Sequence, residues 1–479
     1  MSFPRYAEYK DSGVEWLREV PAHWGVLPIK RDLDFITSGS RGWADHYADD
    51  GELFIRIGNL TRDSLELDLS DIQRVAVPSG SEGERTTVKP GDLLFSITAY
   101  LGSVAIAPNW LEPSYVSQHV ALARLAGQKL TPRWVGYAVL SFIGKTYLET
   151  QAYGGTKIQL GLDDVANLVT TVPPIPEQTA IAAFLDRETG KIDALVAEQE
   201  KLIALLKEKR QAVISHAVTK GLNPNAPMKP SGIEWLGDVP AHWSVKRLKF
   251  IVGDDAGVQM GPFGGMLLEL DSSETGYKVY GQENTISGDF SLGSRWIDAA
   301  RFADLERYEI TTGDIVLTRK GSLGNARLIS QLPHRGIADS DTIRVRVNPK
   351  LMSSAFLALL MHRSGYIAEQ LALAKRGAIL AGINTETVSG LTAIVPDIAE
   401  QEQLLVHVAE LDQCYGDLIR EAENTVALLR ERRSALISAA VTGQIDVRDF
   451  AARLTSADDE ETPFNPPRLR DGWLRETAI

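Results

Sequence analysis

The sequence contains a single cysteine, Cys414, and this scarcity excludes several kinds of site. One thiol cannot form an internal disulfide, and it cannot supply the cysteine clusters that bind structural zinc. The eight histidines show no ligand spacing such as His-Glu-x-x-His, and no glycine-rich loop of the phosphate-cradling type occurs. No lysine follows Lys375, so the carboxylate at Asp397 has no nearby lysine with which to form a nuclease site. We therefore expect no catalytic residue, no metal site and no cofactor on this chain.

Long apolar runs are also scarce. The first six residues lack the apolar core of a signal peptide. Residues 93–111 are uncharged and long enough to span a membrane, but Gly102, Pro108 and Asn109 favour strand, turn and strand instead. A cytoplasmic protein without a membrane segment is expected.

An excess of basic residues is absent as well. The net charge is −13, residues 1–175 carry more acidic than basic side chains, and residues 222–395 carry equal numbers. A protein that binds nucleic acid mainly by charge has a basic surface. If this chain binds DNA, it should bind weakly alone, and partners should supply much of the phosphate neutralisation.

One stretch lacks proline altogether, from Glu177 to Gly221. Its apolar residues recur three or four apart, with some interruptions, which predicts a helix with a narrow seam for one partner helix. Proline before the start and glycine after the end are the expected boundary signals. The predicted seam residues are Ile181, Leu185, Ile192, Leu195, Leu202, Leu206 and Val213.

Residues 395–445 repeat this pattern 223 positions later. Glu400-Gln401 corresponds to Glu177-Gln178, and Val441-Thr442 corresponds to Val218-Thr219. The second predicted seam consists of Leu404, Val408, Tyr415, Leu418, Leu429 and Leu436. We expect the two helices to pair with each other, because the seams are narrow for ordinary core packing. The alternative is that each helix packs on its own globular neighbour.

The globular parts are duplicated too. Ser12-Gly13-Val14-Glu15-Trp16-Leu17 returns as Ser231-Gly232-Ile233-Glu234-Trp235-Leu236, and Val20-Pro21-Ala22-His23-Trp24 returns as Val239-Pro240-Ala241-His242-Trp243. Further along, Pro90-Gly91-Asp92-Leu93-Leu94 is matched by Thr312-Gly313-Asp314-Ile315-Val316. The nearly constant offset indicates that a whole unit was copied. For His23 and His242 a packing role is favoured over a functional one.

The copies differ between these shared frames. Residues 41–52 are polar and aromatic, whereas residues 259–265 are rich in glycine. Short β-rich runs, among them 53–57, 93–98 and 315–318, predict strands, and residues 133–151 and 354–374 have helical patterns. The predicted fold class is α+β: two tandem mixed α/β domains joined by a pair of long antiparallel coiled-coil helices with an internal pseudo-two-fold repeat. The predicted divisions are 1–175, 176–221, 222–395, 396–445 and an extended tail at 446–479.

These repeated motifs, taken together, resemble the DNA-specificity subunit of type I restriction–modification enzymes. The resemblance covers about residues 10–445. It implies a non-catalytic subunit in which 1–175 and 222–395 are target recognition domains, each reading one half of a split, asymmetric DNA site. It also implies that the helices 176–221 and 396–445 set the half-site spacing and dock two modification subunits. S-adenosylmethionine would be bound by those subunits, and motor and nuclease subunits could join the complex.

Base-reading residues need polar or charged side chains on loops that reach a groove. In the first unit the candidates are Arg41, Arg56, Asn59, Thr98, Tyr100, Gln118 and Lys157. In the second they are Gln259, Phe263, Gln282, Asn284, Arg319, Lys320, Ser322 and Arg376. Two rival readings remain open at this point. The chain could be a structural scaffold whose repeated domains bind proteins, or an enzyme in its own right.

Overall fold

The computed structural model describes residues 3–39, 41–77, 83, 85–152, 159–253, 257–267, 276–320, 325–376 and 382–450. Within this part of the chain there are two compact units. The first contains the residues up to Glu200 and those from Glu423 onward, and the second contains Lys201–Ala422. Lys157, Ser322 and most of the predicted tail lie outside the described residues.

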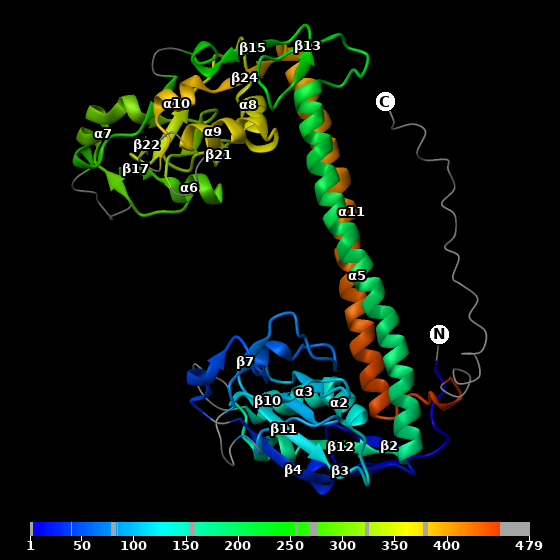
Figure 1. Ribbon diagram of the computed structural model, residues 1–479. Helices are drawn as coiled ribbons and strands as arrows, with labels where there is room; N and C mark the ends of the chain where they lie inside the picture. The colour runs from blue at the N-terminus through cyan, green and yellow to red at the C-terminus, as the bar shows by residue number, and fades with distance from the viewer. Residues whose placement is uncertain are drawn as a thin grey trace. The chain divides into compact units, whose positions relative to one another are not determined.

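The first unit contains two four-stranded sheets and several short helices (Figure 1). One sheet has the order β4-β11-β8-β9 and is antiparallel, and the other has the order β10-β6-β7-β5, in which β10 and β6 run parallel. The strands are β1 Tyr9–Asp11, β2 Glu19–Pro21, β3 Gly25–Pro28, β4 Leu33–Ser38, β5 Tyr47–Ala48, β6 Glu52–Ile55, β7 Gln73–Val75, β8 Leu93–Ser96, β9 Val104–Ile106, β10 Ser114–Val116, β11 Val120–Leu125 and β12 Val169–Val172. The helices are α2 Pro132–Leu140, α3 Phe142–Gln151 and α4 Leu162–Ala166.

The second unit repeats this plan. Its sheets have the orders β16-β23-β20-β21 and β18-β17-β22-β19, and β17 and β22 are the parallel pair that corresponds to β6 and β10. The strands are β13 Met228–Pro230, β14 Asp238–Pro240, β15 Ser244–Arg247, β16 Val258–Met260, β17 Tyr277–Tyr280, β18 Trp296–Ile297, β19 Glu309–Ile310, β20 Ile315–Thr318, β21 Ala326–Leu328, β22 Gly336–Ala338, β23 Thr342–Val345 and β24 Thr392–Val395. The helices are α6 Gln282–Ser287, α7 Ala299–Leu305, α8 Ser354–Arg363, α9 Tyr366–Arg376 and α10 Thr385–Gly390. Each helical pattern seen in the sequence is thus two helices, divided at Ser141 and at Ser364-Gly365.

In both units the aspartate of the Gly-Asp repeat is buried and pairs with an arginine that is partly exposed to solvent. Asp92 is 1% exposed and accepts hydrogen bonds from Nε and Nη2 of Arg124 at 2.7 and 2.6 Å. Asp314 accepts bonds from Arg346 at 2.7 Å to each carboxylate oxygen. The glycine before each aspartate has a φ of +85° or +94°, a conformation that glycine adopts without a Cβ clash. The repeat therefore fixes the turn that enters β8 or β20.

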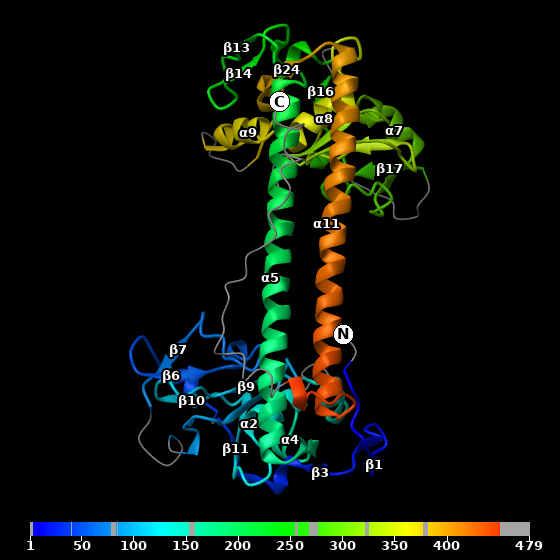
Figure 2. The ribbon, with the colours of Figure 1, turned by 90° about the vertical axis from the view of Figure 1, so that its right-hand side faces the viewer.

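Two very long helices belong to both units: α5, Ile175–Lys220, and α11, Ile398–Val441 (Figure 2). In the first unit the start of α5 packs with the end of α11, and in the second unit the end of α5 packs with the start of α11. Ion pairs join the helices within the first unit, from Arg433 to Asp193 and from Arg430 to Glu200, both at 2.8 Å. The predicted antiparallel pair is confirmed. The alternative also holds in part, because both helix ends join the core of the globular part beside them.

Three of the predicted seam positions are wrong. Leu195, Leu202 and Leu418 remain 47, 42 and 44% exposed. At these turns their C-terminal neighbours, Val196, Ile203 and Ile419, are less exposed. The sequence interpretation favoured leucine, whereas the alternating steps of three and four residues continue through the β-branched side chains.

A tryptophan–histidine pair anchors the start of each long helix. The indole Nε1–H of Trp24 donates to Glu177 at 3.2 Å, and that of Trp243 donates to Glu400 at 2.7 Å. His23 and His242 lie 2.8 and 2.9 Å from the same two carboxylates. These contacts support the packing role predicted for the histidines. They also explain why each Glu-Gln pair begins a helix beside an Ala-His-Trp motif.

Candidate nucleic-acid interface

In each unit, three loops follow three equivalent strands: β6, β8 and β10 in the first unit, and β17, β20 and β22 in the second. Backbone hydrogen bonds join the loops where they leave the strands. In the first unit, Ser117 N donates to Ile55 O at 2.9 Å, and Ile97 N donates to His119 O at 3.1 Å. These bonds join the loops that follow β6, β8 and β10. In the second unit the corresponding bonds run from Asp339 N to Tyr280 O at 2.8 Å and from Arg319 N to Asp341 O at 2.9 Å. We call each group of three loops the reader loops of its unit.

A glycine makes this convergence possible in both units. A Cβ on Gly39 would lie 2.0 Å from Val116 O, and one on Gly261 would lie 2.0 Å from Asp339 O. No side chain fits at such distances. The residue that follows β4 or β16 can therefore pass close to the reader loops only if it is glycine. The shared scaffold thus holds the first residues of each loop in fixed positions, while the side chains further along the loops differ between the units.

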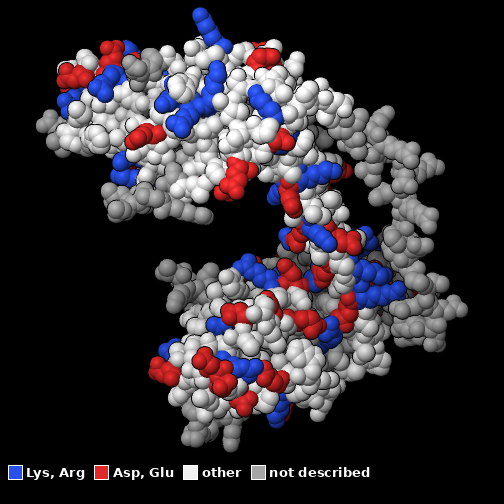
Figure 3. Space-filling view, turned by 45° about the horizontal axis from the view of Figure 1, so that its top comes forward, with Lys and Arg blue, Asp and Glu red and all other residues white. Residues whose placement is uncertain are grey.

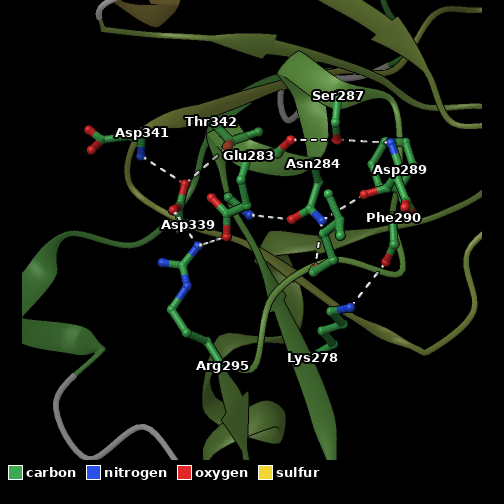
Figure 4. Close-up of polar contacts among 12 residues, drawn as sticks. Lys278, Glu283, Asn284, Ser287, Asp289, Phe290, Arg295, Asp339, Asp341 and Thr342 are labelled. Carbon is green, nitrogen blue, oxygen red and sulfur yellow. Dashed lines mark hydrogen bonds and ion pairs between the residues drawn. The ribbon is translucent and has the colours of Figure 1, made fainter. Parts of the chain in front are cut away.

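Asn59 and Asn284 were predicted to contact DNA, and the structure contradicts both. Each is buried, 3% and 1% exposed, and each amide is fully used inside its own loop. Asn59 Nδ2 donates to Asp68 O and Asp71 O at 2.9 Å, and its Oδ1 accepts from Arg56 N. Asn284 makes the same three bonds, donating to Asp289 O and Leu292 O and accepting from Gly281 N (Figure 4). Both asparagines are polar residues in segments that differ between the units, which is why the sequence favoured DNA contact. In the structure, Asn59 organises the loop after β6 and Asn284 the loop after β17.

The other candidates of the first unit lie in different surroundings. Arg56 pairs with Asp71 at 3.0 Å, and Gln118 Nε2 lies 3.2 Å from His119 Nε2. Arg41 is exposed, and no carboxylate among the described residues lies within ion-pair distance of it. Thr98 and Tyr100 belong to the loop after β8, where Tyr100 is 43% exposed. The reader loops therefore carry Arg56, Thr98, Tyr100 and Gln118, whereas Arg41 follows β4.

Sequence reasoning missed Arg62, which stacks on a predicted reader. Its guanidinium carbon lies 4.3 Å from the centre of the Tyr100 ring, and no carboxylate within the described ranges pairs with it. Ala99, the residue before Tyr100, has a φ of +61°, which is a strained conformation for a residue with a Cβ. Such strain is concentrated at functional sites. Arg62 and Tyr100 are 38 positions apart, so no local pattern could reveal the pair.

In the second unit, Gln282, Arg319 and Lys320 lie together. Gln282 Oε1 accepts a long bond from Lys320 N at 3.4 Å, and Asp341 pairs with Lys320 at 2.9 Å and with Arg319 at 3.6 Å. Gln259, by contrast, accepts a bond from Arg344 in β23 at 3.1 Å, and Phe263 is 62% exposed after β16. Arg376 is the last residue of α9, and its side chain is not described.

A cluster of charged side chains packs against the reader loops of the second unit. Arg295 bridges Glu283 at 2.9 Å and Asp339 at 3.0 Å, and Asp339 also accepts bonds from Asp341 N and Thr342 Oγ1 (Figure 4). Burial raises the pKa of the Asp339 carboxyl, although the Arg295 guanidinium acts in the opposite direction. Lys278, 1% exposed, donates to Phe290 O and Ser291 O at 3.1 and 2.7 Å. The reader loops of the second unit therefore rest on a hydrogen-bonded, charged base.

Surface charge is mixed rather than of one sign. On the face shown in Figure 3, basic and acidic side chains are interspersed. Among the described residues there is no group of three or more histidine, cysteine or acidic side chains arranged to hold a metal ion. In the same part of the chain, no helix has the length and apolar character needed to cross a bilayer.

Comparisons with known proteins bear on this arrangement. Residues 78–204 match the family described as the type I restriction modification DNA specificity domain. The chain is 21% identical to the EcoKI type I restriction enzyme specificity subunit of Escherichia coli K12, over 89% of this chain and 90% of the relative. It is 22% identical to the StySPI specificity subunit of Salmonella potsdam, over 89% and 90%.

Solved structures agree on the fold. A chain from a study of type I R-M complex assembly and conformational transition matches with a TM-score of 0.65 at 16% identity, covering 88% of this chain and 98% of that one. The HsdS subunit of Thermoanaerobacter tengcongensis matches with a TM-score of 0.51 at 15% identity, covering 89% and 98%. With its duplicated units, its paired long helices and its near-complete coverage of these relatives, the chain is similar in sequence and fold to the specificity subunits of type I restriction–modification systems.

Proposed function

We propose that each unit of this chain reads one half of a bipartite, asymmetric DNA site. The observation that carries the proposal is the equivalence of the two sets of reader loops. The bond between Ile97 and His119 in the first unit corresponds to the bond between Arg319 and Asp341 in the second. One scaffold thus presents unlike side chains at matching positions, which is what reading two different half-sites requires.

The two readers would use different chemistry. In the first unit Arg62 and Tyr100 offer an exposed guanidinium stacked on an exposed ring, suited to phosphate or base-edge contact. In the second unit Arg319 and Lys320 share the carboxylate of Asp341. DNA phosphates would compete with Asp341 for both cations, so contact there depends on giving up an existing ion pair.

The helix pair would set the spacing of the half-sites. Helices α5 and α11 each contribute residues to both units, and their antiparallel seam and ion pairs favour a stiff connection. Half-sites about one turn of the duplex apart, roughly 34–36 Å, present the same face to a protein. At about 1.5 Å per residue, the 46 residues of α5 exceed that length.

Chemistry would come from partners. We propose that two modification subunits bind this chain, carry S-adenosylmethionine and methylate the DNA, and that restriction subunits join them where the system has them. The chain itself would be non-catalytic and would act in the cytoplasm, where the DNA is accessible. A net charge of −13 fits a reader that relies on partners for much of the phosphate neutralisation.

The test is sequence-selective DNA binding by the purified complex of this chain with its modification subunits. We expect one bipartite sequence to be bound far more tightly than random duplex at about 150 mM salt, where non-specific binding is weak. A complex that binds all sequences equally would reject the proposal. The mixed surface charge would then favour the rival role, a scaffold whose repeated domains bind only proteins.

A further inference from the structure

The β1–β2 hairpin of the first unit and the β13–β14 hairpin of the second have the same loop. In each, a serine hydroxyl bonds within the loop: Ser12 Oγ to Val14 O at 3.1 Å, and Ser231 Oγ to Ile233 O at 3.2 Å. The glycine between them is left-handed in both loops, with φ values of +72° and +76°. The two hairpins are thus copies in conformation as well as in sequence.

Folding explains most of the repeated hairpin sequence but not its tryptophan. Leu17 and Leu236 are each 6% exposed and anchor the loops in the cores. Trp16 and Trp235, one position earlier, are 43% and 45% exposed. The intramolecular contacts leave nearly half of each indole in water, although both copies of the duplicated chain carry the residue.

A groove lined by both apolar and polar side chains lies beside each exposed tryptophan. In the first unit it has a volume of about 750 Å³, and Phe142 and Tyr147 of α3 help to line it. Phe142 is itself 67% exposed. In the second unit the groove is about 630 Å³, and Leu373 of α9 helps to line it. An exposed aromatic side chain beside a groove that is partly apolar is typical of a protein–protein contact.

The charges that the two hairpins share define the partner. Exposed carboxylates flank the tryptophan at matching positions, Glu15 and Glu19 in the first unit and Glu234 and Asp238 in the second. Arg18 of the first loop is replaced by Gly237. The hairpins also share a lysine, Lys10 and Lys229, but Lys229 Nζ donates to Ala241 O and Trp243 O of its own unit, so the shared charge next to the tryptophan is acidic. A partner with an apolar cleft and a basic rim would complement both hairpins.

We propose that Trp16 and Trp235 are equivalent docking anchors for two copies of one protein, the modification subunit, which binds through a basic-rimmed apolar cleft. This proposal rests on the proposed function for the identity of the partner. The duplicated hairpins explain how one asymmetric chain binds two identical subunits. The reader loops diverged, whereas the docking points stayed alike because the same surface must fit both.

The experiment measures how many modification subunits bind the full-length chain, by native mass spectrometry and by titration in sedimentation velocity. The variants are Trp16→Ala, Trp235→Ala and the double variant. Trp110→Ala and Phe250→Ala are the matched controls, because these side chains are 71% and 61% exposed outside the hairpins. Equal melting temperatures show that a variant remains folded.

We expect each single variant to bind one copy as before and the other roughly 30-fold more weakly, as loss of an aromatic anchor predicts. The double variant should bind neither copy tightly, and the controls should bind two. Two tightly bound copies on the folded double variant would overturn the proposal. So would a double variant that keeps both copies but binds DNA more weakly, because the hairpins would then be DNA contacts.

DNA selectivity of the wild-type complex is measured separately. If that complex ignores DNA sequence while the tryptophan variants still lose copies, the docking surface stands and the proposed function fails. If the complex selects DNA and the double variant keeps both copies, the proposed function stands and the docking surface fails.

Discussion

The indole N–H of Trp243 donates to the Glu400 carboxylate at 2.7 Å, and this bond ties the segment before β15 to the first turn of α11. Trp243 is fully buried, so its N–H loses its hydrogen-bond acceptor if the carboxylate is removed. An unpaired buried donor costs about 1–3 kcal/mol. The start of the long helix is therefore held by a side chain from some 157 positions earlier in the chain.

Glu400→Ala should lower the free energy of unfolding of the second unit by about 1–3 kcal/mol, because it leaves the indole N–H unpaired. Glu400→Gln should cost less, since an amide oxygen can still accept the bond. Urea unfolding followed by tryptophan fluorescence measures both. Glu402→Ala, an exposed change on the same helix, is the control and should be neutral. Equal losses for Ala at both positions would contradict the anchoring role.

Asp92→Ala should destabilise the first unit and leave the second intact. Removing one partner of a fully buried pair costs about 3–5 kcal/mol, and we expect about 2–3 here because Arg124 is 24% exposed. Hydrogen exchange should accelerate in β8 and β11 but not in β20 and β23. Asp314→Ala should give the reverse pattern. Faster exchange in both units from either change would show that the units do not fold separately.

The raised pKa of Asp339 predicts a specific pH dependence. Unfolded aspartate has a pKa of about 3.9. Because the folded carboxyl holds its proton more tightly, its contribution to stability is complete below about pH 4 and is lost as pH rises through the higher folded pKa. Asp339→Asn cannot ionise, so the difference in urea midpoint between wild type and variant should change over that window. A difference that stays constant from pH 4 to 7 would contradict the buried, ionising carboxyl.

Arg62→Ala should weaken binding of cognate DNA about tenfold or more without changing the melting temperature, because the guanidinium is exposed and makes no ion pair among the described residues. Fluorescence anisotropy with the assembled complex measures the affinity. Asn59→Ala is the contrasting variant, since its buried amide holds the loop after β6. Asn59→Ala should lower the melting temperature, whereas Arg62→Ala should not. An Arg62→Ala complex with unchanged affinity would remove this residue from the reader.

Periodicity and repetition in the sequence were enough to predict the paired helices, the mixed α/β units and the duplication, because those features are set by local spacing. The exact seam was not predicted, since Leu195 and Val196 are equally apolar and only the packed partner distinguishes them. Helix breaks at Ser141 and Ser364 were missed because serine is compatible with either state. The reader positions were the hardest to predict. Asn59 and Asn284 look like DNA contacts in sequence, and only their three-dimensional bonds show a structural role.

The helix pair should act as a ruler. Adding one heptad after Val196 in α5 and one at the facing turn of α11 lengthens both helices by about 10.5 Å, roughly three base pairs. We expect the unspecified gap in the DNA site to grow by about that amount, or activity to be lost if the modification subunits cannot follow. A methylated site with its gap unchanged would deny the helices this role.

The most direct test of the central claim is an exchange of the first reader. Residues 30–170 are replaced by those of a relative, and the methylated sequence is mapped in a host that carries the chimeric complex. Two unlike readers on one scaffold predict that one half-site changes while the other half-site and the gap remain. A change in both half-sites, or in neither, would contradict the account.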